Sequence, residues 1–256
     1  MRARTPLLLA VPAALGAVLL VLPLTALLAR TPWHRLPELL GREQVQQALW
    51  LSLRCALAAT ALSVLLGVPL AWVLARTRLP GRRLLRGLVI VPLVLPPVVG
   101  GVALLLAFGR RGLLGPWLVE AGAVPAFTTW GVVLAEAFVA LPFLVLSVEG
   151  ALAALPRHAE EVAGTLGAGP LRVFLSVTLP AIAPAVAAGA VLAGARALGE
   201  FGATTTFAGS LPGTTQTVPL AVYALLQDDP AAAYALSAVL LAVSVALVLA
   251  LRARLR

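Results

Sequence analysis

Residues 155–180, LPRHAEEVAGTLGAGPLRVFLSVTLP, form a charged and glycine-containing connection between two long apolar stretches. Those stretches cover about residues 127–154 and 180–200, and each is long enough to cross a hydrocarbon layer of about 30 Å. The sequence therefore predicts a loop that protrudes from a membrane between two spanning helices.

The connection carries the signals of two short helices. Pro156 suits a first helical turn, and Glu160 and Glu161 favour the positive start of a helix. Gly167 is typical of a helix end, and the glycine–proline pair at 169–170 is typical of the start of the next helix. We expect a rigid element rather than a flexible loop.

The first of these helices has a small apolar ridge. Val162 and Leu166 are four residues apart and therefore lie on one side of it. A short, partly apolar helix that protrudes from a membrane is suited to docking in a groove of another protein.

Six apolar segments are predicted to span the membrane, which gives an all-α, polytopic bundle with one transmembrane domain over residues 1–256. They cover about residues 6–29, 45–75, 87–108, 127–154, 180–200 and 231–251. The first follows Met1-Arg2-Ala3-Arg4, so a cleaved signal peptide is the alternative there. Its apolar stretch is longer than the roughly 7–15 apolar residues typical of a signal peptide, and this favours a retained helix.

Composition supports a lipid environment. Hydrophobic residues make up 61% of the chain and charged residues 11%, whereas soluble domains average about 25% charged residues. No length remains for a separate soluble catalytic domain. The basic residues are all arginine and lie beside apolar segments, so they are predicted to set topology and not to bind nucleic acid.

The arginines also predict the orientation. Twelve lie in loops on the side of residues 155–180 and five lie in loops on the other side. Cytoplasmic loops carry the excess of basic residues, so both termini and the 155–180 loop are predicted to be cytoplasmic in a multi-pass cell-membrane protein.

Small residues mark the fifth segment. Ala185, Gly189, Ala193 and Ala197 recur every four residues, which lets another helix approach closely. This helix is expected inside the bundle or at a subunit interface. Pro180 is expected to open the segment.

The 155–180 loop resembles the EAA loop of bacterial ABC importer permeases. Glu161-x-Ala163-x-x-x-Gly167, followed after nine residues by Val177-x-Leu179-Pro180, has the spacing of that motif. Two mild departures occur, since Val162 replaces a usual alanine and Val177 a commoner isoleucine.

The resemblance implies that the loop is the coupling helix that docks on a cytoplasmic ABC ATPase. The residues assigned to coupling are Glu160, Glu161, Ala163, Gly167, Leu179 and Pro180. The alternative is that the two glutamates only stabilise the start of a solvated helix. The chain has no phosphate-binding glycine-rich loop with a lysine, so ATP hydrolysis is expected on a separate subunit and the chain is not predicted to be an enzyme.

A second resemblance points to the cargo. Residues 195–210, ARALGEFGATTTFAGS, and 215–223, TQTVPLAVY, resemble the oxyanion branch of these permeases, and most closely the molybdate permeases. Sulfate and tungstate permeases share the Arg-Ala-Leu-Gly-Glu-Phe-Gly pattern, so another oxyanion or another ABC cargo remains the alternative. The resemblance implies a homodimer, two ATPase subunits and an extracytoplasmic oxyanion-binding protein.

The candidate pathway residues lie in the first of these stretches and are Arg196, Gly199, Glu200, Gly202, Thr204 and Thr205. Arg196 and Glu200 are four apart, so a structural ion pair is favoured over direct contact with an anion. The glycines and threonines are expected to form a narrow polar constriction.

Two further charges, Arg54 and Glu136, fall inside predicted spans and are expected to pair in the bundle interior. Cys55 is expected to be a buried thiol. His34 and His158 lack the neighbours a metal site requires, and no cofactor is predicted. An intramembrane enzyme would need catalytic carboxylates, a histidine cluster or Gly-x-Ser-x-Gly, none of which is seen, and a scaffold would leave the complete coupling motif unexplained.

Overall fold

The computed structural model describes residues 7–254, and every regular element in that range is a helix. The elements are α1 (Leu7–Arg30), η1 (Trp33–Arg35), α2 (Leu36–Leu40), α3 (Glu43–Arg76), α4 (Arg82–Val94), α5 (Pro97–Phe108), α6 (Gly115–Glu120), α7 (Thr129–Ala154), α8 (His158–Thr165), α9 (Pro170–Val173), η2 (Phe174–Thr178, a π-helix), α10 (Leu179–Leu198), α11 (Gly202–Ala208), α12 (Val218–Asp228) and α13 (Pro230–Arg254). The all-α prediction is confirmed.

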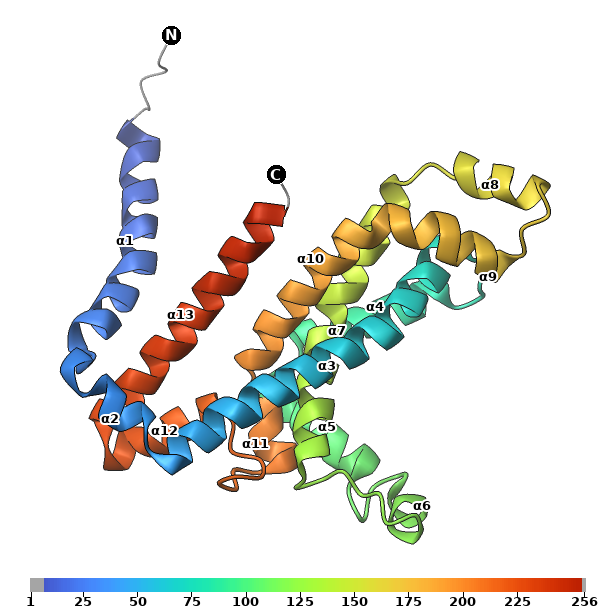
Figure 1. Cartoon of the computed structure of the whole chain (residues 1–256). Coiled ribbons are helices and arrows are strands. Elements are labelled where there is room, and N and C mark those ends of the chain that lie inside the picture. Colours follow the sequence, from blue (N-terminus) through green and yellow to red (C-terminus); the bar gives the residue numbers. More distant parts are fainter. Residues whose placement is uncertain (1–6, 255–256) are drawn as a thin grey trace.

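Five helical runs within residues 7–254 are long and apolar enough to cross a membrane. They are α1, α3, α7, the continuous run Pro170–Leu198, and α13. The third expected span, at 87–108, is not one helix. Two shorter helices, α4 with 13 residues and α5 with 12, share that crossing (Figure 1).

Prolines explain the break. Leu95 is extended, with ψ 132°, as is usual before a proline, and Pro96 and Pro97 have no N–H to continue the helical hydrogen bonds. Pro92, by contrast, lies inside α4 without ending it. The position of the apolar segment was therefore predicted correctly, but the prediction of one continuous helix was wrong.

The core of the chain is the packing of α7 against α3 and α10. Leu144, Val148 and Leu152 of α7 are fully buried there with Ala59 and Ala71 of α3. Small residues allow the close approach of α10, since a Cβ on Gly189 would lie 3.0 Å from side-chain atoms of Leu144 and Ser147.

The small-residue stripe of α10 is used inside the chain. Gly189, Ala193 and Ala197 are buried and Ala185 is half-buried. Of the two expected locations, the bundle interior is therefore confirmed for the three buried positions.

Helix α1 stands apart from this core. Among the described residues it makes few contacts, chiefly with α13, and the two helices lie apart over most of their length (Figure 1). Its leucines are exposed over most of its length, including Leu8, Leu19 and Leu20. An isolated apolar helix of this kind needs lipid or another protein around it.

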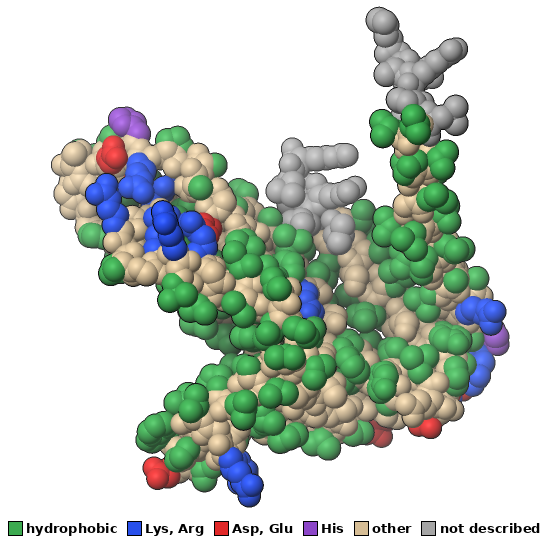
Figure 2. All heavy atoms as spheres, turned by 180° about the vertical axis from the view of Figure 1, so that it is seen from behind, with side chains coloured by type: hydrophobic (Ala, Val, Ile, Leu, Met, Phe, Trp, Pro, Cys, Tyr) green, Lys and Arg blue, Asp and Glu red, His purple; other side chains and the backbone are tan. Residues whose placement is uncertain are grey.

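The two ends of the bundle differ. The described ends of α1 and α13 lie toward the end that carries α8, whereas α2, α6 and α12 lie at the other end (Figure 1). Basic side chains gather at both ends, most densely near the α8 end, and hydrophobic surface covers the region between them (Figure 2). This distribution is the one expected of a membrane-spanning protein.

Candidate functional site

The start of α8 follows from its sequence, with one difference. Leu155 is extended, with ψ 119°, because it precedes a proline, and α8 begins only at His158. The expectation that Pro156 lies in the first helical turn is therefore wrong. Glu160 and Glu161 do lie in the first turn, as predicted.

The end of α8 depends on Gly167. Its φ of +85° is a left-handed conformation that glycine adopts without strain. The amide of Gly167 donates to the carbonyl of Gly164 at 3.0 Å, and the amide of Ala168 donates to that of Ala163 at 3.1 Å. These two bonds form the Schellman motif that closes many helices.

The second short helix merges with the fifth span. Helix α9 passes through the π-helix η2 into α10, so the spanning run begins at Pro170 and not at Pro180 as expected. Pro180 has no N–H to donate, and it is tolerated where the regular bonding pattern is already interrupted by the wider π turn.

Glu160 and Glu161 face different surroundings. Glu160 Oε2 lies 3.2 Å from Nε of Arg76, and Glu160 Oε1 accepts a hydrogen bond of 2.8 Å from Oγ1 of Thr178. The side chains of Arg76 and Glu160 are only 9% and 15% exposed. Glu161 is exposed.

Apolar side chains accompany Glu161 on the outer surface of the loop. Val162, Leu166 and Leu171 are exposed, Leu166 to 83%. Ala163 and Leu179 are half-buried, and Pro180 is exposed. We call the surface of Glu161, Val162 and Leu166 the α8 outer face.

A pocket of about 310 Å³ lies beneath α8. Its walls include Trp72 and Arg76 of α3 and Phe174 and Thr178 of η2. The Trp72 and Phe174 rings meet edge to face at 6.1 Å. The loop is thus held to the bundle by both aromatic and ionic contacts.

At the other end of α10, Arg196 and Glu200 form the expected ion pair. Nη2 of Arg196 lies 2.6 Å from Oε2 of Glu200, and the two side chains are 28% and 1% exposed. Oε1 of Glu200 accepts a hydrogen bond of 2.8 Å from the amide of Ala203. The pair therefore also holds the first turn of α11.

Two glycines let α11 lie directly on α5. A Cβ on Gly202 would lie 2.8 Å from Cβ of Pro97, and a Cβ on Gly101 would lie 2.7 Å from Cβ of Thr206. Thr204 is fully buried in the same layer. Gly202 and Thr204 are therefore packing residues within this chain.

The remaining pathway candidates reach the surface. Gly199 and Thr205 are exposed, and Arg196 is partly exposed. The Thr205 hydroxyl donates to the carbonyl of Phe201 at 2.8 Å, so its hydrogen is used within the helix.

The sequence model of the binding-protein-dependent transport system inner membrane component family matches residues 63–256. The chain belongs to this family. It is 53% identical to the Molybdenum transport system permease protein ModB of Mycobacterium tuberculosis over 243 residues. That match covers 95% of this chain and 92% of the relative. It is 38% identical to the Sulfate transport system permease protein CysT of Escherichia coli, over 90% of this chain and 84% of the relative.

The fold agrees with that membership. A crystal structure of a bacterial ABC transporter involved in the import of the acidic polysaccharide alginate matches with a TM-score of 0.68, at 18% identity, over 95% of this chain and 92% of that chain. This permease is thus a multi-pass membrane component of a transport system and not an enzyme.

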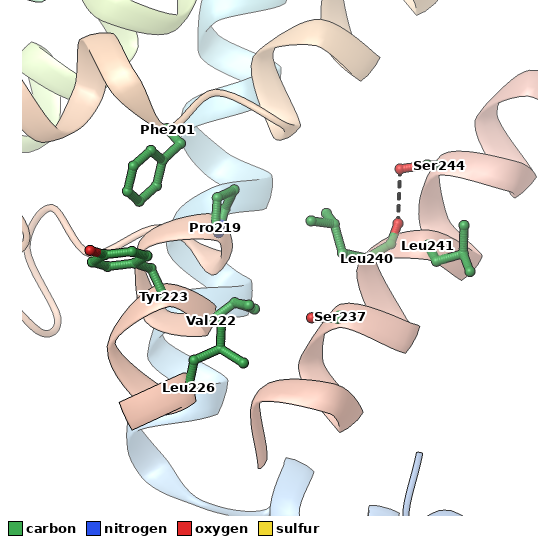
Figure 3. A pocket seen from close by; sticks show the side chains of 9 residues that line it. All are labelled: Phe201, Pro219, Val222, Tyr223, Leu226, Ser237, Leu240, Leu241 and Ser244. Atoms are coloured by element: carbon green, nitrogen blue, oxygen red, sulfur yellow. Dashed lines mark hydrogen bonds between the residues drawn. The ribbon is translucent and has the colours of Figure 1, made fainter. Parts of the chain in front are cut away.

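The permease has two aromatic residues near the candidate pathway that were not singled out from the sequence. Phe201 and Tyr223 lie with ring centroids 5.3 Å apart. Both belong to the oxyanion-type stretches, which was the available signal. They line a pocket of about 500 Å³, which residues of α12 and α13 also line (Figure 3).

This pocket is apolar in practice. Ser237 and Ser244 of α13 also line it, but the Ser237 hydroxyl donates to the carbonyl of Ala233 on the same helix. The Ser244 hydroxyl donates to the carbonyl of Leu240 (Figure 3). It offers an anion little beyond the Tyr223 hydroxyl.

The two remaining charges in the spans do not pair as expected. Arg54 is exposed and lies 5.9 Å from the centroid of the Trp50 ring. Glu136 is buried as expected, but its Oε2 has no hydrogen-bond partner among the described residues. Neither forms an ion pair within residues 7–254, so the pairing prediction is wrong for both.

Proposed function

We propose that this permease is the membrane-spanning subunit of an ATP-driven molybdate importer. The main support for molybdate as the substrate is the 53% identity to a molybdenum permease over nearly the whole of both chains. The 38% identity to a sulfate permease supports sulfate import as the second candidate.

The α8 outer face is proposed as the docking surface for a cytoplasmic ATPase. Its carboxylate and two apolar side chains are exposed while the loop behind them is fixed by Gly167 and by contacts to the bundle. Within the assigned coupling residues, Glu161 supplies the contact, Ala163 and Gly167 shape the helix, and Leu179 and Pro180 lead into α10. In the proposed topology the α8 end is cytoplasmic, and both chain termini, which lie outside the described residues, are cytoplasmic too.

The pathway is proposed to lie between two copies of the chain, with an extracytoplasmic oxyanion-binding protein delivering the anion. Arg196, Gly199 and Thr205 reach the surface of the chain, and Glu200, Gly202 and Thr204 lie buried behind them. In the proposed dimer the exposed residues lie on the surface that the two copies share. The exposed length of α1 supports a second subunit as its neighbour.

Uptake of labelled molybdate tests the substrate. Cells lacking this permease are complemented with the wild type, and excess unlabelled sulfate or tungstate is added as competitor. Restored uptake that resists sulfate is expected. Restored uptake that sulfate abolishes would favour the sulfate candidate, and no restored uptake would contradict molybdate import.

A further inference from the structure

Four segments of the chain meet at one point on the inner side of α8. Arg76 is the last residue of α3, Glu160 lies in the first turn of α8, and Thr178 is the last residue of the π-helix before α10. The Arg76 guanidinium also donates from Nη2 to the carbonyl of Leu155, at 3.1 Å, where α7 ends. We call Arg76, Glu160 and Thr178 the α8 clamp.

The clamp is well shielded from solvent. An ion pair with two side chains less than one-sixth exposed is screened much less by water than a surface pair. The Nε–H of Arg76 is not directed at an acceptor, so the contact is an ion pair and not a hydrogen bond. The side chain of Glu160 is therefore committed to its own chain, unlike that of Glu161.

The clamp also acts where the backbone changes register. π-Helices are rare, but those that do occur are often found at functional sites. This one ends at Thr178. The Thr178 hydroxyl is bonded to Glu160 and its side chain is buried, so α8 is linked directly to the start of α10.

We propose that the α8 clamp transmits movement of the coupling loop to α3 and α10, which makes its members positioning residues for coupling ATP hydrolysis to transport. The proposal rests on the proposed function, in which α8 docks on the ATPase. Glu160 then acts through the bundle, whereas Glu161 acts at the subunit contact.

The test compares two adjacent conservative variants in the full complex of permease, ATPase and binding protein in proteoliposomes. Glu160→Gln keeps an acceptor for Thr178 and removes the charge facing Arg76. It is expected to leave the complex assembled and to lower the molybdate moved per ATP hydrolysed by about fivefold or more, the lower range of typical coupling between sites. Glu161→Gln, the matched control, is expected to weaken ATPase binding instead.

Two further variants guard against misfolding. Thr178→Val replaces the hydroxyl with a methyl group. It should lower the molybdate moved per ATP hydrolysed less than Glu160→Gln does. Exchange of the charges in Arg76→Glu with Glu160→Arg should recover part of the ratio lost in each single variant. An assembled Glu160→Gln complex with the wild-type ratio, or the same loss of ATPase binding in both glutamate variants, would overturn the clamp.

Failure of the substrate assignment is distinguishable. A wild-type complex that hydrolyses ATP without moving molybdate counts against the proposed cargo alone. The clamp is then tested by ATP-dependent labelling of a cysteine replacing the exposed Thr205, with Cys55→Ser as background. Glu160→Gln should abolish the ATP-dependent change in labelling rate, and an unaltered change would overturn the clamp.

Discussion

An arginine–glutamate pair lies at each end of α10, and the two pairs are built differently. Arg196 and Glu200 are four residues apart on one chain segment, whereas Arg76 and Glu160 come from helices far apart in the sequence. In the Arg196–Glu200 pair the acid is the more buried partner, and in the Arg76–Glu160 pair the arginine is. The comparison shows that the same chemistry fixes a local turn in one place and joins distant helices in the other.

Removing Arg196, the more exposed partner of the Arg196–Glu200 pair, should have the largest effect on stability. Arg196→Ala leaves the buried Glu200 carboxylate without a counter-charge, which typically costs about 3–5 kcal/mol. Thermal unfolding of the purified permease in detergent measures the loss. Arg196→Lys keeps the charge and should lose less, while an unchanged unfolding temperature in Arg196→Ala would contradict the pairing.

The next effect concerns the packing of α11 on α5, next to the Arg196–Glu200 pair. Gly202→Val places a side chain against Pro97, where a Cβ alone already lies at 2.8 Å, and overpacking of this kind costs about 1–3 kcal/mol. Gly199→Ala is the matched control, because a Cβ there would meet nothing closer than 3.8 Å. Equal stability of the two variants would show that α11 does not lie on α5 as described.

At the α8 end, Gly167→Ala should cost about 1–2 kcal/mol, because a Cβ is strained at φ +85° even though space around it is open. A bulky residue at this position should uncouple transport while the permease still inserts. Gly169→Ala has open space and an ordinary backbone conformation, with φ −67° and ψ 160°, and should behave like the wild type. Normal transport with a bulky residue at 167 would contradict the rigid loop.

The smallest effect is expected at the partly exposed Arg42–Asp229 pair, at the end of the bundle opposite α8. Nη1 of Arg42 lies 2.6 Å from Oδ2 of Asp229, and this hydrogen bond, followed by one from the Ala232 amide, lowers the pKa of Asp229 below its usual 3.8. A lowered carboxyl pKa stabilises the folded state above the unfolded pKa, and that contribution is lost as the pH falls through the folded pKa. Asp229→Asn should therefore destabilise slightly at pH 7, less in high salt, and progressively less as the pH falls through the folded pKa of Asp229.

The features predicted from sequence are those set by nearby residues. The apolar segments, the acidic first turn of α8, the role of Gly167 and the Arg196–Glu200 pair depend on spacing along one helix. Such spacing is visible in the sequence because helix geometry fixes which positions are neighbours.

The features that were missed depend on distant contacts or on backbone register. Nothing in the sequence near Arg76 indicates Glu160 as its partner, and the π turn before Pro180 cannot be read from residue types. The break at Leu95–Pro96 had a visible proline signal, but prolines are tolerated in membrane helices, as Pro92 is in α4. The signal was therefore ambiguous.

ATP-dependent accumulation of molybdate in proteoliposomes tests the proposed transport role most directly. The vesicles contain this permease with its ATPase and binding protein, and wild type is compared with Glu161→Ala at equal permease content. Accumulation by the wild type that requires ATP, and that Glu161→Ala largely loses, is the predicted result. Wild-type vesicles that take up no molybdate with ATP, or equal accumulation in both, would contradict molybdate import driven through the α8 outer face.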